Sequence, residues 1–442
     1  MAAELCAPIL YPEQATFERN DSYWSDELPS PDAALTRDLE VDVAIVGGGY
    51  TGLSTAYYLA SLPSAPRVVV LEAVRCGNGA SGRNGAMVLN LKIASAQPRL
   101  SSRLYALTVE NTRRIRALSA ALNFDCELEL AGAMTTLRDE AQAREAVSEV
   151  EEWRRLGLPL EFWSRAKTTA ALGTKAYTAG VFDPNAGQVH PGKLVGLWKA
   201  AAVKMGAEIY EGTPVHHILE GRVHVLSTTT GHEIRARHLV LATNAYTSKL
   251  GYLRRAVAPI TNYVAVTNPL ALTDLQELGW TSRIPFNDTR REVYYAGCTR
   301  TGRIHFGGGR VDYEFNNGIR PPADRKLRIS SLHEEFARVF PSLKELSFQR
   351  SWFGFVDVSL DQQPGVGRAG KYGNVYYGLG YSGEGVNLSS VFGRIIADLV
   401  DGRAHLWEWL PLLNRRFIPV PNEPLRWPFI QGDLAIGRLF EH

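Results

Sequence analysis

The chain contains Asp42-Val-Ala-Ile-Val-Gly47-Gly-Gly49-Tyr-Thr-Gly52, in which a short apolar strand leads through glycines at G-x-G-x-x-G spacing into a helix-like segment. In such a stretch Gly47 permits a tight turn, Gly49 lets the backbone approach a pyrophosphate, and Gly52 lets the helix pack closely on its strand. The unpaired N–H groups at the start of the helix then favour an anion. This pattern predicts a dinucleotide cradle.

A second apolar strand follows and reads Arg67-Val-Val-Val-Leu-Glu72. Its closing acid lies twenty positions after Gly52, about where a carboxylate accepts the ribose hydroxyls of an adenosine. The alternative reading is a glycine-rich turn that binds no ligand. We prefer the dinucleotide reading because strand, glycines, helix and acid occur in the order that such a site requires.

The composition is that of a large folded enzyme. The chain has 442 residues, of which 45% are hydrophobic, and this length is enough for two substantial domains. Its 48 basic and 46 acidic side chains give a net charge of +2, and no basic block resembles a nucleic-acid or anionic-membrane footprint. We therefore expect neither nucleic acid nor a membrane as a partner.

The sequence shows no signal for export or membrane insertion. No stretch is apolar over the roughly 18 residues that a membrane span needs, and the first residues lack the basic and apolar regions of a signal peptide. The four cysteines, Cys6, Cys76, Cys126 and Cys298, stand far apart without metal-finger spacing. These features predict a cytoplasmic protein with reduced thiols and no metal site.

Two further glycine-rich stretches lie far along the chain from the cradle. One is Gly77-Asn-Gly-Ala-Ser-Gly-Arg-Asn-Gly-Ala86, and the other is Gly378-Leu-Gly-Tyr-Ser-Gly-Glu-Gly385, which leads into a helix. A stretch with so few side chains is favourable where a large molecule presses against the backbone. Nicotinamide enzymes also begin with a dinucleotide cradle, but three such stretches favour an extended flavin; an ordinary loop at 378–385 is the alternative.

The last of these stretches also has an electrostatic interpretation. A helix that begins near Gly383 would place the partial positive charge of its N-terminus by the pyrimidine edge of an isoalloxazine ring. That charge would stabilise the anionic reduced ring by roughly 0.3 to 2 kcal/mol. The position of this helix start therefore supports a redox cofactor.

Together with Ala242-Thr-Asn-Ala-Tyr246 and Phe306-Gly-Gly-Gly309, these stretches resemble the FAD-dependent amine and amino-acid oxidoreductases of the D-amino-acid oxidase, glycine oxidase and sarcosine oxidase group. The chain is most similar to the gamma-glutamylputrescine oxidase branch, and the resemblance covers about residues 20 to 405. It implies an extended FAD and oxidation of a C–N bond by hydride transfer to the flavin. Hydrolysis of the imine follows, and molecular oxygen as the acceptor would yield hydrogen peroxide.

The expected fold class is α/β, with a Rossmann-like FAD-binding domain and an inserted α+β substrate domain built on a mixed sheet. The insertion is expected in two pieces because strand and helix patterns typical of the first domain return after it. The expected segments are an N-terminal arm at 1–35, FAD-binding segments at 36–100, 180–255 and 350–442 with a C-terminal tail, and substrate-domain segments at 101–179 and 256–349.

The resemblance assigns residues to the cofactor. The first glycine turn would hold the pyrophosphate, Glu72 the ribose, and residues 81–84 the ring and ribityl side. The full set of expected contacts is Gly47, Gly49, Tyr50, Thr51, Gly52, Glu72, Ala80, Ser81, Arg83, Asn84, Gly85, Asn244, Gly380, Ser382, Gly383, Gly385, Val386 and Asn387. The FAD is expected to be non-covalent, because the span from Trp352 to Gly367, where some relatives carry the linking cysteine, has none.

Glu384 departs from the family, since related sequences often carry His at this place. It is a candidate to pair with the ammonium group of an amine or diamine, because opposite charges within about 4 to 6 Å stabilise each other. The alternative is that an acid in the first turn of a helix is favourable without any ligand.

Three more residues are candidates for the substrate site. His305 alternates with Ile304 and Phe306 along a strand, so we expect it to face the cavity, close to where the sarcosine oxidase branch has a lysine linked to oxygen activation. Trp352 and Tyr381 are candidates to wall the cavity and hold a cation by their ring faces. A hydrogen-bonded structural histidine and ordinary core aromatics are the alternatives.

The main expectation is an FAD-dependent oxidase of a small amine or amino acid, with oxygen as its second substrate. A flavin dehydrogenase that passes electrons to another acceptor is the nearest alternative. A flavin-binding protein without turnover belongs to a different class, and a nicotinamide enzyme remains a further alternative. The mechanism would need little from acids or bases, because the protein mainly positions the donor carbon and excludes water.

Overall fold

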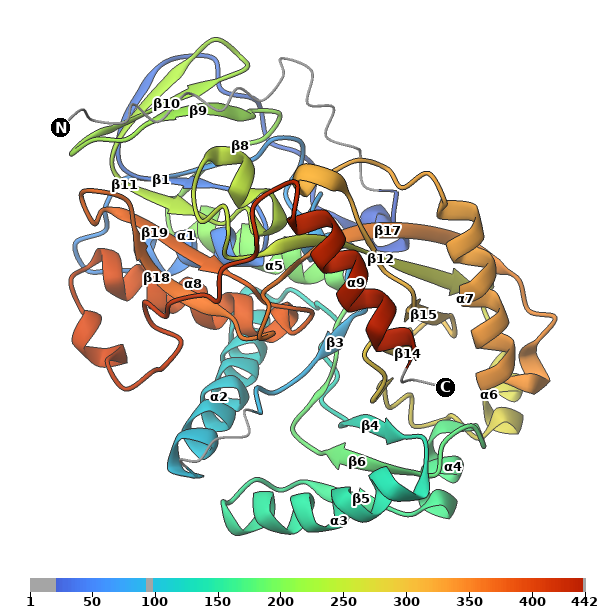
Figure 1. Cartoon of the computed structure of the whole chain (residues 1–442). Helices are drawn as coiled ribbons and strands as arrows, with labels where there is room; N and C mark the ends of the chain where they lie inside the picture. The colour runs from blue at the N-terminus through green and yellow to red at the C-terminus, as the bar shows by residue number, and fades with distance from the viewer. Residues whose placement is uncertain (1–20, 93–97, 440–442) are drawn as a thin grey trace.

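Two large sheets form the body of the molecule, and helices cover both of them (Figure 1). The structure is a computed structural model that describes residues 21–92 and 98–439. A mostly parallel sheet stands beside a larger mixed sheet, which confirms the expected α/β class. Within the described residues, no helix is both long and apolar enough to cross a membrane.

The first sheet is parallel at its centre, in the order β18-β19-β11-β1-β2-β8, and the hairpin of β9 and β10 pairs with β11. Its strands are β1 (Leu39–Val46), β2 (Val68–Leu71), β8 (Glu208–Tyr210), β9 (Val215–Leu219), β10 (His224–Thr228), β11 (Glu233–Leu241), β18 (Gly365–Ala369) and β19 (Val375–Leu379). The second half of β1, residues 43–46, is a continuous apolar run because it is buried on both faces of the sheet.

One face of this sheet is covered by helices. α1 (Tyr50–Ala60) contacts both α5 (Pro191–Lys204) and α8 (Gly385–Val400), and α8 also contacts α2 (Pro98–Leu122). These helices and the sheet share one large apolar core. α8 begins at Gly385, at the end of the third glycine-rich stretch, as the sequence predicts.

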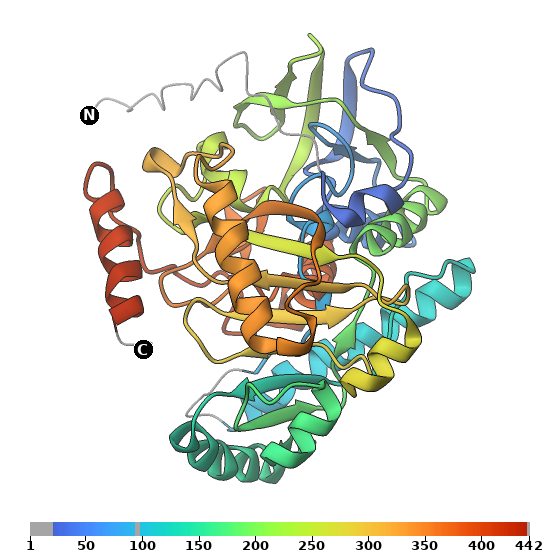
Figure 2. The same cartoon turned by 90° about the vertical axis from the view of Figure 1, so that its right-hand side faces the viewer.

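The second sheet has the order β16-β12-β15-β14-β13-β4-β6-β5, with β17 also paired to β12. Its strands are β4 (Ala133–Leu137), β5 (Glu161–Trp163), β6 (Ala179–Asp183), β12 (Ala258–Thr267), β13 (Phe286–Asp288), β14 (Tyr294–Cys298), β15 (Ile304–Gly308), β16 (Asp312–Tyr313) and β17 (Phe348–Val358). Figure 2 shows α7 (Arg325–Val339), in orange, lying across this sheet.

The remaining elements are smaller or lie at the edges. They are the paired strands β3 (Met87–Val88) and β7 (Gly187–Gln188), and the helices α3 (Glu140–Arg155), α4 (Arg165–Leu172), α6 (Leu272–Leu278) and α9 (Arg426–Leu439). α9, the red helix of Figure 1, lies close to β16 near the C-terminus.

The strand β17 departs from the expected division of the chain. Residues from 350 onward are expected in the first domain, but β17 pairs with β12 over nearly its whole length, from Val358 opposite Ala258 to Phe348 opposite Thr267. Residues 348–358 therefore belong to the second sheet. The other boundaries of the expected domains remain predictions.

The expected N-terminal arm lies partly outside the described residues. Within the described part of this arm, Tyr23–Glu27 forms a short 3-10 helix. Trp24 within it is buried, and its indole N–H donates to the carbonyl of Asn84 at 2.9 Å. This segment therefore packs against the second glycine-rich stretch.

Replacement of Phe336 by Ala tests the core under α7. Phe336 is fully buried and packs its ring against Phe306, Phe340 and Phe348. The cavity left by Phe336→Ala should lower the free energy of unfolding by about 3 to 5 kcal/mol. Leu327→Ala on the same helix is the control, because Leu327 is 58% exposed and should change stability by less than about 0.5 kcal/mol. Equal losses for both variants in denaturant unfolding would contradict the described packing.

Candidate cofactor and substrate site

The turn between β1 and α1 has the close packing that its glycines predict. Gly47 has a φ of 109°, and a Cβ atom there would lie 2.4 Å from the carbonyl oxygen of Ala242. A Cβ on Gly52 would lie 1.9 Å from the carbonyl oxygen of Gly47. Neither position accepts a side chain without movement of the backbone. The turn and the first helical turn line a cavity.

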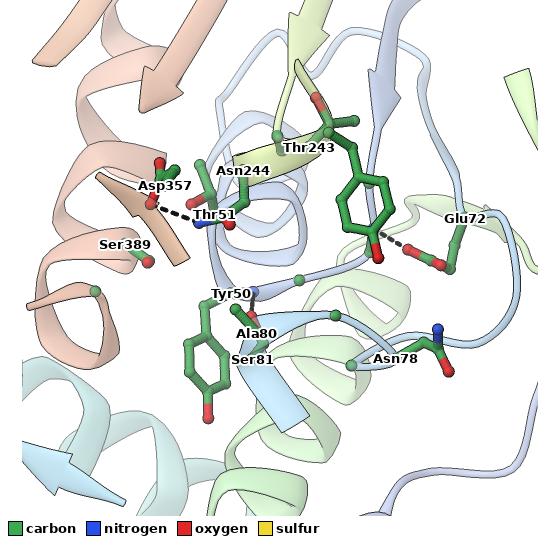
Figure 3. A pocket seen from close by; sticks show the side chains of 18 of the residues that line it. Tyr50, Thr51, Glu72, Asn78, Ala80, Ser81, Thr243, Asn244, Asp357 and Ser389 are labelled. Carbon is green, nitrogen blue, oxygen red and sulfur yellow. Dashed lines mark hydrogen bonds between the residues drawn. The ribbon is translucent and has the colours of Figure 1, made fainter. Parts of the chain in front are cut away.

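This first cavity has a volume of about 190 Å³, and segments distant in sequence line it. Figure 3 shows Glu72 and Asn78 at one side of it and Asp357 and Ser389 at the other. The second glycine-rich stretch contributes residues between Gly77 and Asn84, and the third contributes residues between Tyr381 and Val386. The three glycine-rich stretches therefore meet around one cavity, as expected for a long cofactor.

The start of α1 lies against the second glycine-rich stretch. The backbone N–H of Tyr50 donates to Oγ of Ser81 at 2.9 Å, and a Cβ on Gly49 would lie 2.8 Å from the same oxygen (Figure 3). Gly49 caps α1 without a side-chain hydrogen bond. The N-terminus of α1 thus presents partial positive charge at the cavity wall, which suits a phosphate.

Glu72 closes β2 at the edge of the cavity. Its carboxylate oxygens accept hydrogen bonds from the backbone N–H of Gly48 at 2.8 Å and of Val74 at 3.1 Å. Burial raises the pKa of the Glu72 carboxyl, and the backbone donors oppose that rise. Each carboxylate oxygen has a second lone pair, so Glu72 can still accept from a hydroxyl group.

Asp357, a site residue that no sequence pattern indicates, lies on β17 and is fully buried at the cavity wall. Its Oδ1 accepts from the side-chain amide of Asn244 at 2.9 Å (Figure 3). Its Oδ2 accepts from the backbone N–H of Gly380 at 2.6 Å. Asp357 therefore joins the loop after β11 to the loop after β19. Burial raises its pKa to about 7, although these hydrogen bonds favour the ionised form.

A second, larger cavity of about 360 Å³ adjoins the first. Residues of β12, β14, β17 and α9 line it together with the glycine-rich stretches. The two cavities meet, because they share the lining residues Ala80, Asn84, Val356, Gly383 and Val386. A molecule in the second cavity would therefore lie beside the part of a molecule in the first cavity that reaches these shared residues.

Most of the expected cofactor residues line one of these cavities. Those on the first cavity are Gly47, Gly49, Tyr50, Thr51, Glu72, Ala80, Ser81, Asn84, Asn244, Gly383, Gly385 and Val386, and Arg83, Gly85 and Ser382 line the second. Gly52, Gly380 and Asn387 line neither. Gly52 packs α1 on the turn, whereas the Asn387 side chain donates to the carbonyls of Leu89 and Thr108 at 3.1 Å each and so holds α8 in place.

Tyr381 and Glu384 lie on the cavity walls. The Tyr381 hydroxyl forms a 2.7 Å hydrogen bond with Oγ1 of Thr51 at the first cavity. Glu384 lines the second cavity and precedes α8, but its side chain makes no capping hydrogen bond to the helix. Loss of hydration beside the surrounding protein raises the pKa of the Glu384 carboxyl, and the positive charge of Lys92 lowers it. The side chain is exposed, so contact with solvent limits the rise.

Trp352 is not found on the wall of either large cavity. It is fully buried, packs against Trp24, and donates its indole N–H to the carbonyl of Arg83 at 2.9 Å. Trp352 therefore packs as an ordinary core aromatic, which is the alternative given above. Its contact supports the second glycine-rich stretch from behind.

His305 does face a cavity, but a small separate one that it shares with Trp24, Gln188 and His190. Its strand is covered on both faces, so the alternation of side chains does not indicate which cavity it meets. Burial lowers the pKa of His305 to about 3, and the ring is therefore neutral at pH 7. A neutral His305 on this small cavity supplies no positive charge at either large cavity.

The described residues contain no group of three or more His, Cys, Asp or Glu side chains placed to hold a metal ion. The described cysteines, Cys76, Cys126 and Cys298, are buried free thiols, and none lines either large cavity; Cys6 lies outside the described residues.

The variant Asp357→Asn should change how stability depends on pH. The folded pKa of about 7 lies above the ordinary aspartate pKa of 3.8, so the native state binds the extra proton and loses stability as pH rises between these values. From pH 5 to pH 8 this group should remove roughly 3 kcal/mol from the wild-type free energy of unfolding, and Asp357→Asn should lack that loss. Denaturant unfolding of both proteins at the two pH values measures this difference. An identical pH dependence in the two proteins would contradict the raised pKa of Asp357.

Comparisons with known proteins agree with this geometry. The family model described as DAO, FAD dependent oxidoreductase, matches residues 42–399. The gamma-glutamylputrescine oxidoreductase of Escherichia coli (strain K12) is 31% identical over 434 residues, which cover 93% of this chain and 96% of the relative. The glycine oxidase of Geobacillus kaustophilus (strain HTA426) is 25% identical over 391 residues, which cover 85% of this chain and 97% of the relative.

The fold is also similar to solved structures. The crystal structure of glycine oxidase from Geobacillus kaustophilus superposes with a TM-score of 0.73 at 23% identity, and the match covers 86% of this chain and all of that one. FAD fits the first cavity, because the start of α1 suits a phosphate and the Glu72 carboxylate at the cavity edge can accept from ribose hydroxyls. The chain belongs to the DAO family of FAD-dependent oxidoreductases.

Proposed function

We propose that this chain oxidises the C–N bond of a small amine or amino acid to an imine and passes the electrons to molecular oxygen, which yields hydrogen peroxide. The observation that carries the proposal is the junction of the two cavities at Ala80, Asn84, Val356, Gly383 and Val386. A substrate in the second cavity would lie there beside the cofactor. The printed names of the relatives, an oxidoreductase of gamma-glutamylputrescine and an oxidase of glycine, support a C–N bond as the target.

When bound, FAD supplies the chemistry by accepting a hydride from the carbon next to the substrate nitrogen. The chain's own residues would hold that carbon in place and exclude water. The second cavity suits this task, because apolar side chains such as Val264, Phe355 and Val356 form much of its wall. Tyr295 on the same wall stays protonated, since burial raises its pKa.

The charges around the second cavity favour a cationic substrate. Its charged lining residues are the cations Arg83 and Arg291 and the acids Glu292, Glu384 and Asp433. Arg291 is paired with Asp433, and Arg83 donates to two backbone carbonyls, those of Asn78 at 2.8 Å and Phe353 at 3.0 Å. Glu384 makes no capping bond to α8 and lies next to the junction residue Gly383, so its carboxylate is available to an ammonium group.

The FAD is proposed to be non-covalent. The span from Trp352 to Gly367 contains no cysteine, and the described cysteines line neither large cavity. Binding would then depend on the hydrogen-bonding and backbone contacts of the first cavity.

A dehydrogenase that uses another electron acceptor is the second candidate. One observation favours it: among the described residues, no lysine or histidine lines either large cavity, and the two arginines that line the second one, Arg83 and Arg291, are already bonded to backbone carbonyls and to Asp433. This alternative shares the same substrates and the same cofactor.

Anaerobic mixing with a panel of amines tests the oxidation step. Primary amines, diamines, N-methyl amino acids and both enantiomers of common amino acids should include at least one compound that bleaches the flavin band at roughly 450 nm. The same compound in air should then yield hydrogen peroxide in proportion to the amine consumed. Bleaching without peroxide would support the dehydrogenase, and a flavin that no member of the panel bleaches would contradict the proposed function.

The variant Glu384→Gln tests recognition of a cation. If Glu384 pairs with a non-reacting ammonium group, KM for a linear diamine should rise roughly tenfold, with a much smaller change for the monoamine of equal length. Glu408→Gln removes the same charge from an exposed position away from both cavities and is the control. An unchanged KM for the diamine in Glu384→Gln would remove this residue from the substrate site.

A further inference from the structure

The helix α9 lies beyond the part of the chain that the family model matches, which ends at residue 399. It nevertheless forms part of the wall of the second cavity through Phe429, Ile430, Asp433 and Leu434. Figure 1 shows α9, in red, crossing in front of β12 and β17, whose residues line the same cavity. The C-terminal segment therefore reaches the second cavity from outside the residues that the family model matches.

The start of α9 is attached firmly to the body. Glu423 just before the helix accepts hydrogen bonds from the hydroxyl of Tyr313 at 2.9 Å and from the backbone N–H of Asn316 at 2.8 Å. Arg426 is buried and donates to the carbonyl of Arg254 at 3.1 Å. These contacts determine where the first turn of the helix lies.

Contacts further along the helix hold it against the cavity. Asp433 forms an ion pair with Arg291, and both residues line the second cavity. Ile430 is 6% exposed and packs in a small apolar cluster with Ala258, Ile260 and neighbouring residues of the second sheet. The helix is therefore a fixed wall of the cavity.

Phe429 is the exception among these contacts. It lines the cavity, yet 45% of its surface is exposed, and it belongs to none of the apolar clusters of the core. A large aromatic side chain at the wall of a cavity is typical of a surface that contacts a ligand. Trp427 on the same helix is 44% exposed but does not line the cavity.

We propose that α9 is a specificity-determining wall of the substrate site, on which Phe429 contacts the carbon chain of the amine, so that the enzyme prefers amines with a longer alkyl chain to short ones. This inference rests on the proposed amine substrate. The ion pair between Asp433 and Arg291 positions the helix and does not contact the reacting carbon.

Binding of amines that cannot be oxidised tests this wall directly. Tert-butylamine and tert-octylamine have no hydrogen on the carbon that carries nitrogen, so the FAD-loaded enzyme can bind them but cannot remove a hydride. In titration calorimetry the wild type should bind tert-octylamine more tightly than tert-butylamine. Phe429→Ala should weaken tert-octylamine binding by roughly tenfold and leave tert-butylamine nearly unchanged. Trp427→Ala, which removes an equally exposed aromatic side chain from the same helix, should bind both amines like the wild type.

The outcomes separate this inference from the proposed function. Loss of the chain-length preference in Phe429→Ala alone supports the wall, even if no oxidisable amine bleaches the flavin. Equal effects of the two aromatic substitutions, or a wild type without a chain-length preference, would overturn the wall. If the wild type shows no chain-length preference but still oxidises linear amines, the proposed function remains in place.

Discussion

The close approach of the Gly47 backbone to the carbonyl of Ala242 is the constraint on which the site depends. Because Gly47 has no side chain, the turn after β1 can lie almost in contact with the end of β11. The carboxyl ends of the parallel strands then open onto one edge of the sheet, which is where α/β folds bind their ligands. α1 starts at this edge and brings its N-terminus to the cavity, and the loop after β19 reaches the cavity from the neighbouring strand.

The second sheet completes the site by bringing β17 to this edge. Asp357 on β17 accepts hydrogen bonds from both loops that end strands of the first sheet, so one buried carboxyl links the two halves of the molecule where the cavities meet. Keeping a carboxyl in this position costs stability when it is ionised, as its raised pKa indicates. Such a cost is consistent with a role in shaping the site.

The sequence predicted what local patterns encode. The glycines at 47, 49 and 52, the acid at 72 and the start of α8 act through short-range sterics and hydrogen bonds, and their positions are readable from spacing alone. Asp357 and α9 were missed because their roles arise from pairing between distant segments: β17 with β12, and α9 with the second cavity. His305 shows the same limit, since alternation along a strand covered on both faces does not indicate which of two cavities the side chain meets.

The central claim is that the cavity bounded by the three glycine-rich stretches holds FAD. Titration of the apoprotein with FAD, followed by the quenching of flavin fluorescence, measures this most directly. Saturation at one FAD per chain in the wild type, and loss of binding in a Gly47→Val variant that remains folded by circular dichroism, is the predicted result. A wild type that takes up no FAD, or a folded Gly47→Val protein that binds it as tightly as the wild type, would contradict the claim.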